Sequence, residues 1–193
     1  MGLEAANIGG RYGGIPAGNA MAFSDRIERL KARRDIGALI RILKYGGLRF
    51  RLERDLRRSE AARALAELKA VEGVEPLLRA LRGERAFVRA AAARALGEIG
   101  DSRVLPPLRA MTEDRGSGVA TQVALALARL GEPRGFELLV SLLRSVGDPE
   151  RIGAAVALGE LGDPDAADHL MRVVGTSDEI LGEGGQRGRE AGR

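Results

Sequence analysis

The sequence predicts an all-α fold, namely a right-handed α-solenoid of about four helix-turn-helix repeats. Three observations predict it. Related hexads begin at Leu65, Leu96, Leu127 and Leu158, always 31 residues apart. The residues before each hexad are rich in alanine, and aromatic residues make up only 3% of the chain. Small aliphatic side chains suit closely packed helices better than a β-sandwich, and a repeat with such a period indicates a solenoid.

The first half of each repeat is the alanine-rich segment, which we expect to be a helix. In the second repeat one helical face holds Val88, Ala92, Ala95, Leu96 and Ile99. Alanine on this face allows a neighbouring helix to approach closely. A Gly–Asp pair follows, at residues 100–101 and 162–163. Glycine takes the left-handed conformation that ends a helix, and aspartate caps the next one.

The second half of each repeat is a short amphipathic segment after the hexad. These segments read VEPLLRAL, VLPPLRAM, FELLVSLL and ADHLMRVV, and IGALIRIL precedes the first repeat. Pro76, Pro106 and Pro107 fall in the opening turns, where proline is tolerated. One such helix pair cannot bury its apolar face alone, whereas stacked pairs can.

The pattern VRxxAAxALGx[IL]GD runs from Val88 to Asp101 and returns, nearly complete, from Arg151 to Asp163. It resembles the HEAT-like repeat of the phycobilisome-lyase type. The third repeat departs from it at Ala120, and the first has Lys69–Ala70 in place of Gly–Asp. The resemblance covers residues 35–174 and implies a HEAT-like solenoid. It says little about function, because the shared residues are packing residues.

Three regions are expected along the chain. Residues 1–23 are Gly-rich and form a flexible leader, residues 24–174 form the HEAT-like repeat domain, and residues 175–193 form a disordered tail. Ser24 is a candidate N-cap for a polar capping helix. The first repeat also carries extra residues near 44–58, which we interpret either as a lengthened turn or helix start or as a loop on a working edge.

Catalytic chemistry finds little support in the sequence. Deoxyhypusine hydroxylase has a similar fold and binds two irons through His–Glu pairs, but this chain has a single histidine, His169, and no His–Glu dipeptide. His169 is expected on a partly exposed helix face. The chain has no cysteine and no phosphate-binding glycine motif. We interpret three recurring glutamates, Glu98, Glu132 and Glu160, as solvated turn residues. The sequence therefore predicts no metal, no other cofactor and no enzymatic activity.

Charge is concentrated near the N-terminal end. Residues 25–69 contain 14 basic and 7 acidic residues, a local net charge of +7. One interpretation of this excess is a surface for nucleic acid or for an acidic partner. We favour the other interpretation, a solvated, arginine-rich end of the array with ion pairs one helical turn apart, for instance between Glu53 and Arg57.

Two positions of the repeat carry arginine. One holds Arg58, Arg89 and Arg151, and there we favour a ladder in which each arginine bonds to a neighbouring repeat. The other holds Arg63, Arg94, Leu125 and Val156. This position is expected toward the inner surface, which would then change from basic to apolar along the array. The alternative is that Leu125 and Val156 pack in the core.

The predicted function is that of a non-catalytic cytoplasmic adaptor. Its concave surface, built from the second helices, would bind a protein partner. The candidate residues for that surface are Arg58, Arg63, Arg89, Arg94, Leu125 and Val156, with a basic edge of Arg49, Arg51 and Arg54. The alternatives are nucleic-acid binding through residues 25–69 and a bilin-lyase-like chaperone subunit for a tetrapyrrole protein. The sequence has no transmembrane segment and is compatible with a monomer or an end-stacked dimer.

Overall fold

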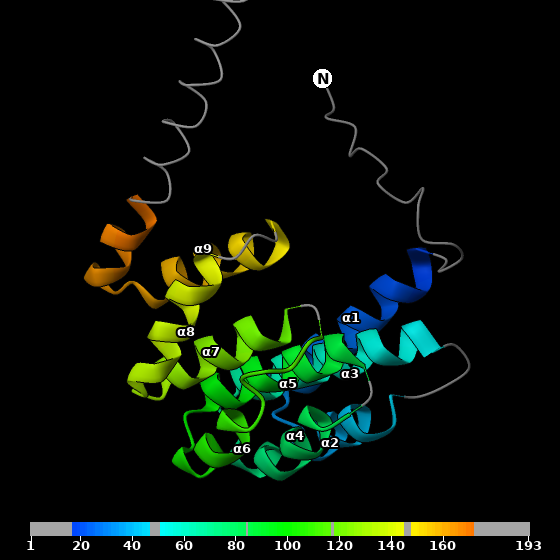
Figure 1. Ribbon diagram of the computed structural model, residues 1–193. Helices are drawn as coiled ribbons and strands as arrows, with labels where there is room; N and C mark the ends of the chain where they lie inside the picture. Colours follow the sequence, from blue (N-terminus) through cyan, green and yellow to red (C-terminus); the bar gives the residue numbers. More distant parts are fainter. Residues whose placement is uncertain (1–16, 47–50, 84, 117, 145–147, 172–193) are drawn as a thin grey trace, which may run out of the picture.

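The structure is a computed structural model that describes residues 17–46, 51–83, 85–116, 118–144 and 148–171. Within these ranges the chain forms helices joined by turns and contains no strand (Figure 1). The predicted all-α solenoid is confirmed. None of the described helices combines the length and the apolar character needed to cross a membrane.

The helices alternate between two layers, which we call first helices and second helices. The pair α1 (Ala17–Ala32) and α2 (Ile36–Tyr45) is followed by the four repeats. The repeats are α3 (Arg51–Glu67) with α4 (Val74–Leu81), α5 (Ala86–Ile99) with α6 (Leu105–Arg109), α7 (Val119–Arg129) with α8 (Pro133–Leu143), and α9 (Asp148–Leu161) with helical residues 164–171. The 3₁₀ turns η1 (Val71–Gly73) and η2 (Ser102–Val104) precede α4 and α6. Figure 1 shows α1, α3, α5 and α7 in one layer and α2, α4 and α6 in the other.

The Gly–Asp pairs end and begin helices as predicted. Gly100 ends α5 in the left-handed conformation with φ 86°, and Asp101 Oδ1 accepts a hydrogen bond of 2.9 Å from the Arg103 amide. Gly162 has φ 64° after α9. In the first repeat Lys69 takes the same conformation with φ 51°, although a side chain there costs about 1 kcal/mol. The break is therefore kept even where the glycine is absent.

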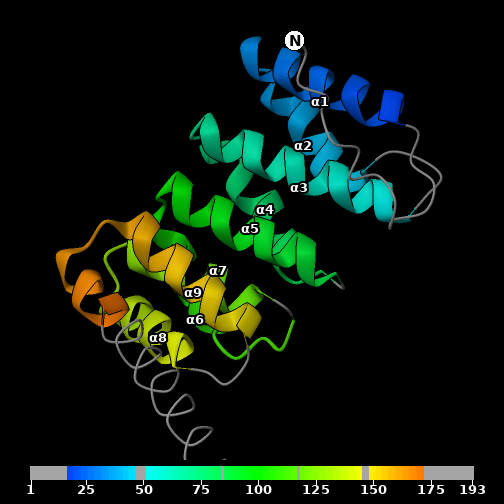
Figure 2. The same cartoon turned by 90° about the horizontal axis from the view of Figure 1, so that it is seen from above.

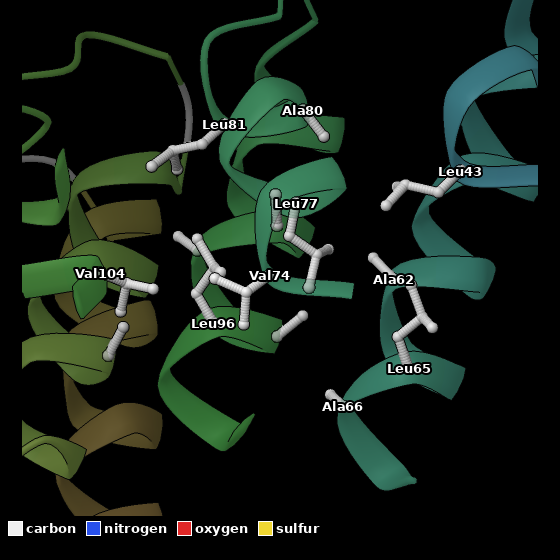
Figure 3. Packing of buried hydrophobic residues seen from close by; sticks show 14 of the residues in the cluster. Leu43, Ala62, Leu65, Ala66, Val74, Leu77, Ala80, Leu81, Leu96 and Val104 are labelled. Atoms are coloured by element: carbon white, nitrogen blue, oxygen red, sulfur yellow. The ribbon is translucent and has the colours of Figure 1, made fainter. Parts of the chain in front are cut away.

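The core consists of small side chains at the seams between helices. Ala62, Ala92 and Ala93 are completely buried. A Cβ atom added to Gly97 of α5 would lie 2.5 Å from the Ala126 Cα of α7, so the backbones of these two helices are almost in contact. Leucines fill the space between the two layers, and Figure 3 shows Leu65, Leu77 and Leu96 entering it from α3, α4 and α5.

The N-terminal part differs from the prediction. Helix α1 begins at Ala17 and runs through Ser24, so Ser24 is not its N-cap, and residues 17–23 of the expected leader belong to this helix. Residues 1–16 and the expected tail, 175–193, lie outside the described residues. The extra residues of the first repeat extend α3 to 17 residues, against 14 for α5 and α9. For residues 51–54 the interpretation as a lengthened helix start is confirmed, whereas residues 47–50 lie outside the described residues.

The array bends toward the first helices. The Arg94 guanidinium of α5 lies 3.2 Å from a carboxylate oxygen of Glu160 on α9, although α7 separates the two helices in the array. Packed helices lie about 8–10 Å apart, so α5 and α9 would be about 16–20 Å apart in a flat row. Figures 1 and 2 show α9 lifted over α7 on the side of the first helices. The first helices therefore line the inside of the bend, and the prediction of a concave surface built from second helices is wrong.

Candidate partner-binding surface

The candidate residues all lie on first helices. Arg58 and Arg63 belong to α3, Arg89 and Arg94 to α5, Leu125 to α7 and Val156 to α9. We call the exposed side of α3, α5, α7 and α9 the first-helix face. The structure brings only Arg63 and Arg94 together on this face, where both line one groove.

Arg58 and Arg89 hold neighbouring repeats together. Arg58 Nε donates a hydrogen bond of 2.8 Å to the Leu43 carbonyl at the end of α2. Arg89 donates one of 3.0 Å to the Gly83 carbonyl after α4, and two of 2.8 Å to the Asp114 carboxylate after α6. Each arginine thus bonds to the end of the preceding second helix. The predicted ladder is confirmed for these two residues, and they belong to the framework rather than to a docking surface.

Leu125 is not a surface residue, so its place among the candidates is wrong. It is completely buried and packs with Leu139, Ala154 and Leu158. The reason is the bend, which lays α9 over the side of α7 that carries Leu125. Val156 occupies the same repeat position on α9 and is 57% exposed.

The expected basic edge is only partly described. Arg49 lies outside the described residues, and Arg51 begins α3 without a described side chain. Arg54 is half-buried. A Cβ atom added to Gly46, directly after α2, would lie only 2.2 Å from the Arg54 Cγ atom. Arg54 therefore packs on the end of α2 and contributes little to an open edge.

A groove of about 400 Å³ lies between α3 and α5 on the first-helix face. Its walls carry Arg63 and Glu67 from α3 and Arg94 and Glu98 from α5, while Ala66, Ala91 and Ala95 form its apolar part. Alanine at these positions keeps the helices close and leaves room above them. The long side chains stand around an apolar floor, an arrangement that suits a ligand with both polar and apolar groups.

The C-terminal ends of α5, α7 and α9 are tied by four alternating charges. Glu98 accepts from Arg94 at 2.9 Å and lies 3.4 Å from Arg129, and Glu160 lies 2.8 Å from Arg129 and 3.2 Å from Arg94. Glu98, Arg129 and Glu160 occupy one repeat position, 31 residues apart. The interpretation of Glu98 and Glu160 as solvated turn residues is therefore wrong. Glu132 lies elsewhere and pairs with Arg109.

A second cluster of charges joins α1 to α3. Lys31 pairs with Glu28 at 3.0 Å and also with Glu67, and Arg63 donates a hydrogen bond of 2.5 Å to Glu67. Hydrogen bonds to Glu67 and Glu28 raise the pKa of Lys31. Burial opposes ionisation of Glu67, but Lys31 and Arg63 outweigh it and lower the pKa of this carboxyl group. Both directions favour the charged forms of Lys31 and Glu67, and the cluster holds Arg63 at the groove.

Glu60 differs from Glu67 and Arg94 of the same groove, because the net change in its pKa disfavours its charged form. One of its carboxylate oxygens is buried without a described hydrogen-bond partner. Burial raises the pKa of Glu60, although Arg63 and Arg57 partly oppose the change. A donor group of a bound partner that reached this oxygen would satisfy it, so Glu60 is a further contact candidate that the sequence alone did not suggest.

A second groove of about 570 Å³ adjoins the first across Arg94. It lies between α5 and the start of α7 and is lined by Phe87, Ala90, Ala91 and Gln122 as well as by Arg94. Phe87 is 54% exposed, which is unusual for one of only four phenylalanines in the chain. Phe87 was not among the candidate residues predicted from the sequence. The signal was available, because Phe87 falls outside the buried face that begins at Val88.

Groups suited to metal binding are not assembled in the part of the chain that the structure describes, where no three His, Asp or Glu side chains form a possible metal site. His169 is half-buried on the helix at 164–171, and its ring lies edge-on to Phe136 with centroids 6.0 Å apart. Its expected place on a partly exposed helix face is confirmed.

The basic excess near the N-terminal end is partly neutralised. Lys31, Arg57 and Arg63 are ion-paired with carboxylates, and the predicted pair of Arg57 with Glu53 is present. Other basic residues remain exposed on α1, on α2 and in the turn between them, namely Arg26, Arg29, Arg33, Arg34, Arg41 and Lys44. This end of the array keeps a basic surface that is separate from the groove between α3 and α5.

The family model of HEAT repeats matches residues 51–128 and 117–182, which is more than half of the chain. The chain belongs to the HEAT-repeat family. HEAT-repeat proteins are generally non-catalytic scaffolds that mediate protein–protein interactions. The matched model is that of HEAT repeats in general, so the resemblance to the phycobilisome-lyase subtype stays a prediction. No curated protein matches the chain.

Proposed function

We propose that this HEAT-repeat protein is a non-catalytic adaptor that binds a protein partner on its first-helix face. The observation that carries the proposal is the pair of adjoining grooves on either side of Arg94, one bordered by charged groups and the other by Phe87. Both lie on the inside of the bend, where a solenoid offers its largest continuous surface to a ligand.

The two grooves favour a partner segment with mixed chemistry. An apolar side chain of the partner would pack on Phe87 and the neighbouring alanines, since aromatic residues commonly anchor interfaces. A carboxylate of the partner would accept hydrogen bonds from Arg63 or Arg94, which are 54% and 43% exposed in their side chains. The intramolecular ion pairs hold both arginines in place, so little conformational entropy is lost when a partner binds.

The first experiment is affinity capture from native lysate, with and without nuclease, followed by mass spectrometry. The bait is compared with two variants, Phe87→Gln alone and Arg63→Gln with Arg94→Gln. Glutamine is preferable to glutamate here, because a new carboxylate would face Glu67, Glu98 and Glu160. We expect one protein to be captured in both nuclease conditions and to be lost with either variant.

The matched control replaces two arginines at the ends of a second helix. Arg134→Gln with Arg144→Gln removes the same charge from two exposed positions, one in the first turn of α8 and one directly after its end. Capture should be unchanged with this control. If the partner is retained by the groove variants, or lost equally with the α8 control, the first-helix face is not the binding site.

Nucleic-acid binding through residues 25–69 is the second candidate function. It is supported by the six exposed basic residues of α1, α2 and the turn between them. Its signature is distinct, since capture would disappear on nuclease treatment and binding to DNA or RNA would weaken steeply with salt. Arg33→Gln with Arg34→Gln and Arg41→Gln should then abolish binding, whereas the groove variants should not.

A further inference from the structure

The outer side of α9, turned away from α7, repeats a surface that is covered elsewhere in the array. Four of its residues, Ile152, Ala155, Val156 and Gly159, follow Thr121, Ala124, Leu125 and Ala128 of α7 by 31 residues. On α7 these positions receive α9, and Thr121 is 3% exposed while Ala124 and Leu125 are completely buried. Gly153 of α9 sits directly on Thr121, since a Cβ atom added to it would lie 3.6 Å from the threonine methyl group.

On α9 the same positions are open. Ile152 is 62% exposed and Val156 is 57% exposed. A Cβ atom added to Gly159 would meet nothing within 4 Å, in contrast to the equivalent Gly97 of α5, which is pressed against Ala126. The outer side of α9 is therefore an open face with the residue pattern that receives another helix on α7. We call it the α9 outer face and define it by Ile152, Ala155, Val156 and Gly159.

We propose that a second copy of this chain covers the α9 outer face, so that two α9 helices pack against each other in an antiparallel pair about a two-fold axis. Large residues (Ile152 and Val156) and small residues (Ala155 and Gly159) alternate along this face. Their spacing along the helix is the same when the face is read in the opposite direction, as it is by an antiparallel copy. In that pair Ile152 of each copy lies opposite Gly159 of the other, where the structure leaves space for it. The two Val156 side chains then meet beside the axis.

The opposite end of the array argues against head-to-tail stacking. The exposed residues of α1 include Asp25, Arg26, Glu28 and Arg29, so the described side chains at this end present charge rather than an apolar face. An apolar face that met these charges would desolvate them without compensation. A face that pairs with its own copy gives a closed dimer instead of an open filament.

The first test is sedimentation velocity on the full chain over a range of concentrations. The wild-type chain should show a monomer–dimer equilibrium. Ile152→Glu with Val156→Glu should weaken dimerisation by at least about tenfold, because each copy would place carboxylates in an apolar seam. Phe87→Glu is the matched control, since it changes an equally exposed apolar residue on α5 and should leave the dimer intact.

Partner capture by the wild-type chain is measured separately from sedimentation. Failure of the dimer proposal can therefore be distinguished from failure of the proposed adaptor function.

The second test fixes the direction of the pair. The chain has no cysteine, so introduced thiols report only on the designed contact. On mild oxidation Val156→Cys should cross-link to itself, and Ile152→Cys with Gly159→Cys in one chain should cross-link between copies, whereas Ile152→Cys alone should not. A chain that stays monomeric at all concentrations would overturn the proposal, as would a dimer that survives the glutamate substitutions or one that cross-links through Ile152→Cys alone.

Discussion

Arg89 of α5 and Asp114 of the segment after α6 form a two-pronged ion pair, with two hydrogen bonds of 2.8 Å between a guanidinium and a carboxylate that are 15% and 12% exposed. Asp114 also accepts a hydrogen bond of 2.7 Å from the Gly116 amide. The pair joins the start of one first helix to the segment that leads into the next. It fixes the spacing of α5 and α7, on which the second groove depends.

This pair predicts a pH dependence of stability. The hydrogen bonds from Arg89 lower the pKa of Asp114 in the folded chain. The stabilisation is therefore fully present above the ordinary aspartate pKa of about 3.9 and is lost as the pH falls through the lower folded value. Asp114→Asn should cost about 1–3 kcal/mol at pH 7. Urea unfolding at several pH values should show this difference shrinking below about pH 4, and a constant difference would contradict the assignment.

Two equivalent glycines should respond to alanine in opposite ways. Gly97→Ala should destabilise the chain by about 1–3 kcal/mol, because the new Cβ would collide with the Ala126 backbone. Gly159→Ala should stabilise it by up to about 1 kcal/mol, because that position is helical and open. Thermal unfolding at low protein concentration, where dimers do not contribute, measures both. Equal effects would mean that α5 and α7 are not in close contact at Gly97.

Burial of the repeat leucine predicts a severe loss of stability. Leu96 of α5 is completely buried in the main core, and Leu96→Asp should cost more than about 4 kcal/mol by placing an unpaired charge there. Phe87 lies near the start of the same helix and is exposed, so Phe87→Asp should change the free energy of unfolding by less than about 0.5 kcal/mol. Circular dichroism during denaturation compares the two, and a cooperative, folded Leu96→Asp chain would refute the helical register.

The bend of the array predicts coupling between residues two repeats apart. A double-mutant cycle with Arg94→Gln and Glu160→Gln should give a coupling energy of about 0.2–1 kcal/mol at low salt, the range for partly exposed ion pairs. The coupling should fall as salt rises. Arg109→Gln with Glu160→Gln is a suitable control, because Arg109 pairs with Glu132 instead. Zero coupling for the first cycle at low salt would mean that α9 does not fold over α7.

Local chemistry made much of the fold predictable. The 31-residue period, the Gly–Asp breaks and the alanine faces all act within a repeat or between adjacent repeats, so they can be read from one helix at a time. The bonding role of Arg58 and Arg89 was predictable for the same reason. The start of α1 was not, because the residues before Ser24 carry no strong cap or periodic pattern to mark it.

The candidate surface depended on more than one repeat. Arg63, Arg94, Leu125 and Val156 share one repeat position, yet the structure leaves Arg63 and Arg94 at an open groove, buries Leu125 and exposes Val156. Equivalence in sequence sets the side of the helix on which a residue lies, but the bend of the array decides whether the next helix covers it. The bend involves contacts between separate repeats, such as Gly153 of α9 on Thr121 of α7 and the ion pair of Arg94 with Glu160. The sequence by itself determined the repeat and its layers, and only the tertiary structure decided which layer is concave and which residues are open to a partner.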